Sequence, residues 1–246
     1  MAWTNSERKW LRELQHRKGR ENHQAIVVEG RKAIAEFLSS GWEPLLLATT
    51  GDSLGPNCLE VTARDLREVS SLDSPPDSLA VFASKELPER GGGMVLVLDR
   101  IQDPGNAGTL LRMADWFGLS YLLHLSGSVD LGNPKTVQAS MGSLARVPVR
   151  YASESEAIEL LHAQGRPIIV ADLNGTAPSS INWSPIAALV VSNEGQGPSQ
   201  AWQNAATAVA TIARASGSKT DSLNVATAAS MLLYEAHRWA GEPIRR

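Results

Sequence analysis

Short apolar runs alternate with stretches of helical periodicity from residue 94 onward. Met94–Leu98 is an uninterrupted apolar run, which is typical of a strand buried on both faces. Apolar residues then recur at helical spacing from Leu110 to Phe117. The alternation continues with predicted strands at Tyr121–Leu125, Val147–Tyr151, Ile168–Asp172, Ala188–Ser192 and Ala208–Ile212, and predicted helices at Pro134–Leu144, Ser155–Gln164, Ser199–Asn204 and Leu223–Arg238. This order favours an α/β fold with a mostly parallel sheet and helices on both faces.

The first part of the chain predicts a smaller α/β unit. Its expected elements are a helix at 4–18, a strand at Ala25–Glu29, a helix at Arg31–Ser40, and strands at Leu45–Thr49 and Ala80–Ala83. The stretch from Leu87 to Gly93 is rich in proline and glycine, as linkers are. We therefore expect a small domain over residues 1–87, a linker at 88–93 and a larger domain at 94–246.

Composition excludes several classes of protein. The single cysteine, Cys58, rules out a disulfide framework within the chain, and the five histidines show no metal-ligand spacing. No apolar run reaches the length of about 18 residues that a membrane span needs, and no signal peptide is evident. We expect a cytoplasmic protein that uses no metal and binds no membrane.

Charge is distributed unevenly along the chain. The net charge is −3, yet residues 1–32 hold eight Lys or Arg and four Glu, a local charge of +4. A basic leading segment on an acidic body is consistent with an end that faces phosphates, and equally with a solvated helix of mixed charge.

Three loops carry the candidate chemistry, because ligands of parallel sheets bind at the carboxyl ends of the strands. The first loop follows Leu98 and contains Asn106, which we expect to cap the next helix, with Gly108 and Arg112 four residues apart on one helix face. The alternative is a capped helix with a surface arginine.

The second loop, Ser192–Ser199, follows an apolar strand and contains two glycines that suit close passage past a ligand. Here Glu194 would lie at the edge of the sheet where a ligand binds; the alternative is a turn that uses glycine only for its backbone conformation.

The third loop precedes the last helix, which Asp221 or Ser222 can cap, and Asn224 would then fall in the first helical turn. Together the loops indicate a pocket for a polar organic ligand.

The three loops together resemble the motifs of the SpoU (TrmH-like) branch of the SPOUT methyltransferases. The matching residues are Asn106-Ala-Gly108 with Arg112, Asn193-Glu-Gly195 with Gly197, and Ser222-Leu-Asn-Val225. Residues 4–85, notably Val28–Ile34, also resemble the L30e-like RNA-binding domain that often precedes this catalytic domain. The resemblance implies an S-adenosylmethionine-dependent enzyme that methylates a ribose 2′-hydroxyl in RNA, and it favours ribosomal over transfer RNA.

The same resemblance implies a C-terminal trefoil knot and a homodimer whose active site uses both subunits. S-adenosylmethionine would be held by the loops of the knot. The residues that the resemblance assigns to the cofactor are Ser192, Asn193, Gly195, Gly197, Ile212, Leu223 and Val225.

Catalytic roles are likewise implied for Arg112, Asn106, Glu194, Ser222 and Asn224. A guanidinium is a poor base, so either the site makes Arg112 neutral or its charge polarises the hydroxyl while pairing with an RNA phosphate. Asn106 would orient Arg112 or the ribose, and Glu194 would hold Arg112 or a backbone amide. Ser222 and Asn224 would fix the sugar or phosphate of the target nucleotide.

RNA contacts are expected from the basic residues near the N-terminus. These are Arg8, Arg12, Arg17, Lys18, Arg20 and Arg31.

The chain departs from the family pattern at Ile212-Ala-Arg214, at Ser192 and at Ala226-Thr-Ala228. Four alternatives stay open: a silent RNA-binding protein, a transfer RNA enzyme, a base-methylating SPOUT enzyme, and a nucleotide-dependent oxidoreductase. The absence of a GxGxxG fingerprint argues against the last one.

Overall fold

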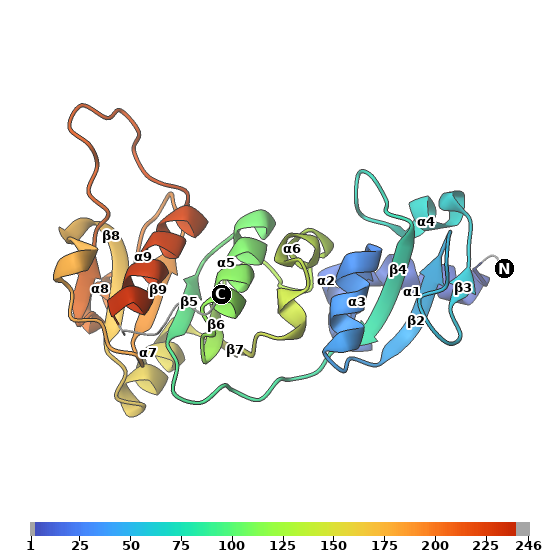
Figure 1. The fold of residues 1–246 in the computed structure, drawn as a ribbon, viewed down its shortest axis with the longest axis horizontal. Helices are drawn as coiled ribbons and strands as arrows, with labels where there is room; N and C mark the ends of the chain where they lie inside the picture. The colour runs from blue at the N-terminus through green and yellow to red at the C-terminus, as the bar shows by residue number, and fades with distance from the viewer. Residues whose placement is uncertain (1–2, 240–246) are drawn as a thin grey trace. The chain divides into compact units, whose positions relative to one another are not determined.

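The computed structural model describes residues 3–239, which form two compact units (Figure 1). Unit 1 contains the chain up to Glu86 together with Asp130–Arg146, and unit 2 contains Leu87–Val129 and the chain from Val147 onward. The segment Asp130–Arg146, which the sequence prediction placed in the larger domain, thus groups with unit 1. Residues 1–2 and 240–246, the ends of the two predicted domains, lie outside the described residues.

Unit 1 is built on a four-stranded sheet of order β1-β4-β2-β3. Among the strand pairs described for this sheet, β2 and β3 run parallel and the other two pairs are antiparallel. Its elements are α1 (Asn5–Leu14), α2 (Arg17–His23), β1 (Ala25–Glu29), α3 (Arg31–Ser39), β2 (Pro44–Thr49), β3 (Leu59–Glu60), α4 (Ala63–Val69), β4 (Ser78–Ala83), α6 (Pro134–Ser140) and η1 (Ser143–Ala145).

Side chains of β1 alternate between two hydrophobic cores, as expected of a strand with period two. Ala25 and Val27 pack in the core that holds α1 and α4. Ile26 and Val28 pack on the opposite face, with Ile34 of α3 and with residues of the Asp130–Arg146 segment. Burial on both faces explains why this strand reads as a continuous apolar run in the sequence.

The predicted single helix at 4–18 is wrong: the chain forms α1 and α2, separated at Gln15 and His16. Gly19 shows why the two helices meet so closely. A Cβ atom at this position would lie 1.9 Å from the carbonyl oxygen of Glu13 at the end of α1. The pattern of charged and apolar residues in this segment is compatible with one continuous helix and also with two shorter ones, so the sequence did not reveal the break.

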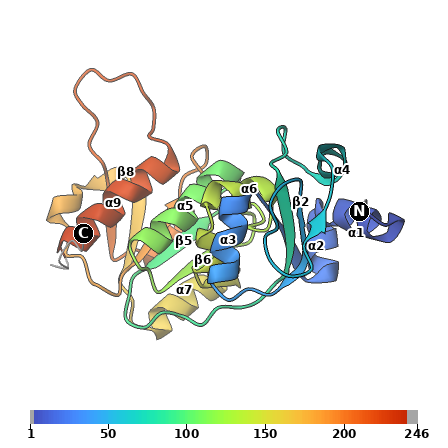
Figure 2. The same ribbon diagram turned by 45° about the vertical axis from the view of Figure 1, so that its right-hand side comes forward.

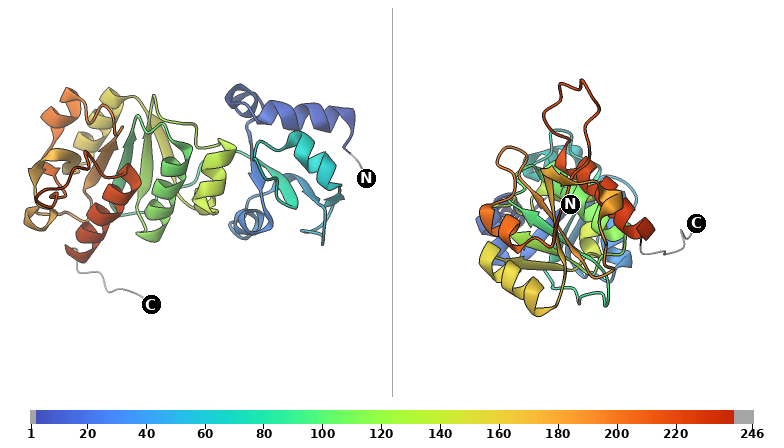
Figure 3. Two further views of the ribbon diagram at one scale, coloured as in Figure 1. Left: turned by 90° about the horizontal axis from the view of Figure 1, so that it is seen from above. Right: turned by 90° about the vertical axis from the view of Figure 1, so that its left-hand side faces the viewer.

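Unit 2 confirms the predicted parallel sheet, since its six strands, in the order β10-β8-β9-β5-β6-β7, all run parallel. Figure 3 shows α5 and α9 on one face of this sheet and α7 and α8 on the other. The elements are β5 (Val95–Asp99), α5 (Pro104–Trp116), β6 (Tyr121–Leu125), β7 (Val149–Ala152), α7 (Glu154–Ala163), β8 (Ile168–Thr176), η2 (Pro178–Ser180), β9 (Ala188–Ser192), α8 (Gln200–Ala205), β10 (Ala208–Ala210) and α9 (Val225–Trp239).

Arg20 is part of the core of unit 1, which corrects its prediction as an RNA contact. Its side chain is only 7% exposed and pairs with Asp130, with Nη2 and Oδ2 2.6 Å apart. Its Nη1 also donates to the carbonyl of Leu14 at 2.7 Å. A guanidinium held in this way has no free donor edge for a phosphate.

We predict that Arg20→Ala destabilises the protein by about 2–3 kcal/mol, because the partly buried carboxylate of Asp130 would lose the positive charge that it pairs with. Arg17→Ala is the matched control on the same helix. Arg17 forms an exposed pair with Glu21, so its loss should change the free energy of unfolding by at most about 0.5 kcal/mol. Urea unfolding measures both values, and equal effects would contradict a structural role for Arg20.

Candidate active site

The site lies where the strand order of unit 2 reverses. From β5 the chain proceeds to β6 and β7 on one side, and later places β9 on the other side of β5. Loops that leave two such strands diverge and leave a crevice at the carboxyl edge of the sheet. Asp99 and Ser192, the last residues of β5 and β9, are register partners, and the amide of Asn193 donates to the carbonyl of Asp99 at 3.1 Å.

The loop after β9 is shaped by Asn193. Its Oδ1 accepts the amides of Gly195 at 2.8 Å and Gln196 at 3.2 Å, and its Nδ2 donates to the carbonyl of Arg100 at 3.3 Å. Gly197 then turns the chain with a φ of +64°, which glycine adopts without strain. These bonds leave Glu194 exposed at the tip of the turn.

The start of α5 differs from the sequence expectation in one respect. Asp103, not Asn106, is the N-cap: its Oδ1 accepts the amide of Asn106 at 2.7 Å, and Pro104 occupies the first helical position. Proline lacks an amide hydrogen that would otherwise need a partner, so it suits this position. Because Asp103 caps the helix, the side chain of Asn106 is free to bond elsewhere.

A hydrogen-bonded network joins the three loops. Asn106 donates from Nδ2 to Oε1 of Glu194 at 3.3 Å, and its Oδ1 accepts from Nδ2 of Asn224 at 2.8 Å. The same Oε1 of Glu194 also accepts the amide of Val225 at 2.8 Å. Side chains up to 118 residues apart in sequence thus meet at one place.

Asn224 is the N-cap of α9, which corrects the expectation that Asp221 or Ser222 would cap it. Its Oδ1 accepts the amides of Ala226 at 3.0 Å and Thr227 at 3.2 Å. Its Nδ2 remains available for Asn106. One amide side chain therefore begins the helix and takes part in the network.

Arg112 stands outside this network. Its side chain is exposed, and no hydrogen bond joins it to Asn106 or Glu194 in the described part of the chain. Glu194 instead holds a backbone amide, the second of its two expected roles. Gly108 is buried although Arg112 is exposed, because four residues rotate the helix by about 40° beyond a full turn.

The other predicted site residues are more dispersed. Ser192 is buried, and its Oγ has no hydrogen-bond partner within the described residues. Ile212 is half-buried and Leu223 is 42% exposed. Ser222 is exposed in the long loop between β10 and α9, which extends away from its unit in Figures 1 and 2. The described structure does not bring Ser222 into the network.

The predicted RNA contacts differ in how freely their charges are presented. Arg8 pairs with Glu68 at 2.7 Å, and Arg31 donates to the carbonyl of Asp52 at 2.9 Å. Arg12 and Lys18 are exposed. A surface hollow of about 430 Å³ is lined by Asn5, Arg8, Lys9, Arg12, Glu13 and His16.

Sequence reasoning gave no role to Asp99 and Arg100, which lie beside the network. Asp99 is 2% exposed, and Arg100 binds both of its carboxylate oxygens, at 3.0 and 2.8 Å. Hydrogen bonding to this carboxylate raises the pKa of Arg100 above its usual value. The only signal in the sequence was an adjacent acid and base at the end of a strand.

Within residues 3–239, no cluster of side chains is suited to holding a metal ion. The same residues contain no helix with the length and apolar character needed to cross a membrane.

Comparison with known proteins identifies both parts of the chain. Residues 93–234 match the SpoU rRNA Methylase family, and residues 5–80 match the MRM3-like substrate binding domain. The 23S rRNA (guanosine(2553)-2′-O)-methyltransferase RlmP of Bacillus subtilis is 29% identical over 94% of this chain and 95% of its own length.

Solved structures agree with this result. A TrmH-family protein from Porphyromonas gingivalis is 33% identical, with a TM-score of 0.85 over 97% of this chain and 99% of that one. The AdoMet-bound rRNA methyltransferase from Sinorhizobium meliloti is 28% identical, with a TM-score of 0.87 over 97% and 96% of the two chains.

The fold is therefore that of an RNA methyltransferase. The chain belongs to the SpoU rRNA methylase family, which confirms the resemblance seen in the sequence. This membership excludes the nucleotide-dependent oxidoreductase.

We predict that Asn224→Ala and Asn224→Asp separate the two roles of this residue. Alanine removes the cap and should lower the free energy of unfolding by about 1 kcal/mol, whereas aspartate caps as well as asparagine does. Neither side chain can donate to Asn106, so both variants should lose methyl transfer. Urea unfolding and a transfer assay check this, and a fully active Asn224→Asp protein would show that the donated bond is dispensable.

Proposed function

We propose that this protein transfers a methyl group from S-adenosylmethionine to a ribose 2′-hydroxyl of ribosomal RNA. The observation that carries the proposal is the network of Asn106, Glu194 and Asn224, which joins three loops at the carboxyl edge of the sheet. One relative that spans 94% of this chain is named as a 23S rRNA 2′-O-methyltransferase, which supports the choice of substrate.

The chain offers suitable groups for the cofactor. The Oγ atom of Ser192 is buried at the end of β9 and lacks a partner within the described residues, so a polar ligand would satisfy it. Leu223 exposes an apolar side chain on the adjoining loop. The residues that would hold the cofactor are Ser192, Asn193, Gly195, Gly197, Ile212, Leu223 and Val225. When bound, the cofactor supplies an electrophilic methyl group on a sulfonium.

Arg112 is the group that we assign to the ribose hydroxyl. A hydroxyl must lose or share its proton as its oxygen gains the methyl group, and a positioned polar side chain assists this step. The exposed guanidinium of Arg112 can pair with a neighbouring phosphate and polarise the hydroxyl at the same time. Asn106 and Glu194 then keep the surrounding loops in place, which sets the geometry of attack.

Unit 1 is assigned to RNA binding. Its match to a substrate-binding domain supports this assignment, as do the exposed charges of Arg12 and Lys18. Arg8, Arg17 and Arg31 add further positive charge, although each already bonds to a neighbouring residue. Such contacts to phosphates make binding strongly dependent on salt.

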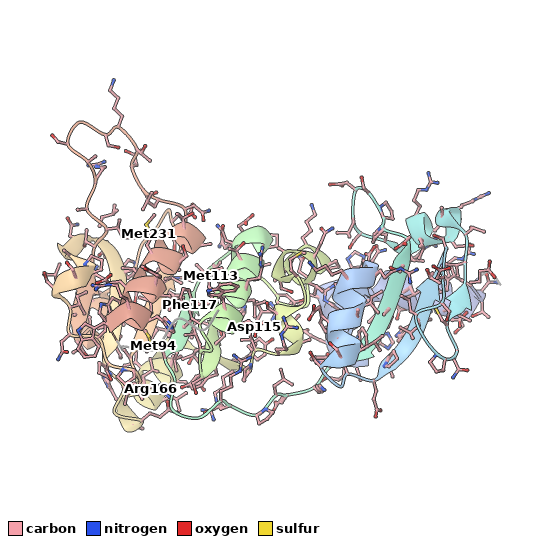
Figure 4. The ribbon with its side chains drawn as sticks, in the orientation of Figure 1. Met94, Met113, Asp115, Phe117, Arg166 and Met231 are labelled. Atoms are coloured by element: carbon pink, nitrogen blue, oxygen red, sulfur yellow. The ribbon has the colours of Figure 1, made fainter. Side chains whose placement is uncertain are left out.

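A homodimer accounts for an apolar surface on α5 and α9. Trp116 is 82% exposed and lies four residues after Arg112, on the same face of α5. Met231 and Tyr234 are 47% and 53% exposed on α9, the helix that packs beside α5. Figure 4 labels Met113 on α5, Phe117 directly after α5, and Met231 on α9. A second copy seated on this surface would bring its own residues toward Arg112.

The path of the chain after β10 is consistent with the knot implied by the family. β10 lies at the edge of the sheet, beyond β8, while the next helix begins at the Glu194 loop that follows β9. The intervening loop must therefore return across at least one strand.

Replacing Arg112 tests the proposed chemistry. Arg112→Ala should reduce transfer to ribosomal RNA by about 100-fold or more, with affinity for S-adenosylmethionine and thermal stability unchanged. Arg112→Lys should recover little, because an ammonium cannot form the planar fork. Near-full activity of the lysine variant would contradict both a fork and a base.

Mapping 2′-O-methyl groups in cells that lack the protein identifies the nucleotide, and a lost mark on transfer RNA or on a base would overturn the assignment.

Trp116→Glu tests the dimer. The wild-type protein should sediment at twice its chain mass of 26.4 kDa, and the variant should sediment as a monomer because a charge cannot be buried there unpaired. Leu173→Glu is the matched control: this residue is 64% exposed and lies on β8, not on either of these helices. Analytical ultracentrifugation distinguishes these outcomes, and a monomeric wild type at micromolar concentration would refute the dimer.

A further inference from the structure

Arg100 has an unusual backbone and a fully engaged side chain. It follows β5 directly, and its φ of +56° lies in the left-handed region that residues with a Cβ rarely adopt. Such conformations persist only when surrounding interactions hold them in place. The side chain shows what those interactions are.

The guanidinium of Arg100 bonds to two segments at once. On one side, Nε and Nη2 bind the two carboxylate oxygens of buried Asp99. On the other side, Nη1 donates to Oε1 of Gln196 and Nη2 donates to the carbonyl of Gly197, both at 2.8 Å. Arg100 therefore links the end of β5 to the loop that follows β9.

The space around Arg100 fits this side chain. A Cβ atom at Gly127, in the loop after β6, would lie 3.3 Å from Cγ of Arg100, and the φ of Gly127 is +91°. The far end of the Asn193–Ser199 loop is also fastened, since Ser199 donates to Oε2 of Glu154 at 2.6 Å. The loop is thus held at Asn193, at Gln196 and Gly197, and at Ser199.

We propose that Arg100 is a positioning residue that holds the Asn193–Ser199 loop in the conformation that receives the methyl donor. This inference rests on the proposed function, because the same loop contains Asn193, Gly195 and Gly197. It assigns Arg100 no contact with the reacting atoms. Its loss should weaken donor binding, and transfer should stay close to the wild-type rate once the donor is saturating.

Two variants of the full-length protein test the inference. Arg100→Lys keeps a positive charge beside Asp99, but one ammonium cannot bind Asp99, Gln196 and Gly197 together. Gln196→Ala removes one link and leaves the Asp99 pair intact. Titration calorimetry with S-adenosylmethionine should show binding weakened by about 10-fold for Arg100→Lys, and by a smaller factor for Gln196→Ala.

Hydrogen exchange provides a readout that needs no donor. Amides of residues 193–197 and of Ser199 should exchange faster in both variants than in the wild-type protein, with little change elsewhere in unit 2. Arg64→Ala is the matched control, because Arg64 forms an exposed ion pair with Glu68 in unit 1. It should change neither donor affinity nor exchange of the loop.

The outcomes separate the two proposals. If the wild-type protein binds no S-adenosylmethionine, the proposed function fails, and faster exchange in the variants would still show that Arg100 holds the loop. If Arg100→Lys binds the donor as tightly as the wild type, the inference is refuted. It is equally refuted if that variant loses its turnover rate while its donor affinity is unchanged, since Arg100 would then act in the reaction itself.

Discussion

One carboxylate oxygen is the interaction on which the site depends. Oε1 of Glu194 accepts both the side-chain amide of Asn106 and the backbone amide of Val225. Its two donors come from the first turns of α5 and α9, while Glu194 itself follows β9. A negative charge is favourable at these positions, because the amino ends of helices carry partial positive charge. The carboxylate therefore fastens two helix starts to a strand end, and three loops that would otherwise move separately form one site.

Helix capping decides which side chains are free to build the network. Asp103 caps α5, so Asn106 can use both its amide nitrogen and its oxygen for other loops. Within the described residues, no other residue caps α9 in place of Asn224, so its side chain performs both tasks. Its oxygen caps α9, and its nitrogen donates to Asn106. Aspartate would cap equally well but could not donate, and serine has a single oxygen for both tasks. The requirement for an acceptor and a donor in one short side chain explains an asparagine at this position.

The sequence predicted what depends on local pattern. The parallel sheet of unit 2 followed from apolar runs such as Ala188–Ser192, and the three candidate loops followed from the position of the strand ends. Contacts between distant residues were not predictable in this way. Arg20 was expected to face RNA, but its environment is set by Asp130, 110 residues further along the chain. The sequence around Arg100 did not predict its left-handed backbone, which hydrogen bonds to the loop after β9 help to hold in place. The type of a residue shows whether its side chain carries a charge. Whether that side chain is buried depends on which distant residues the fold places beside it.

The residues assigned to the methyl donor and the arginine assigned to the ribose hydroxyl are held in place to different degrees. The network of Asn106, Glu194 and Asn224 is complete within one chain, so the loops assigned to the donor are ordered before any substrate arrives. Arg112 faces outward on the same side of α5 as Trp116, and the described chain gives it no partner. Under the proposed function, an arginine in that position gains its fixed geometry when RNA, or a second copy on the apolar surface, surrounds it. Under the proposed function, donor binding then needs a single folded chain, whereas methyl transfer needs the assembled complex. That division would protect the donor from reaction with water, because the group that activates an acceptor is completed only in the presence of the correct one.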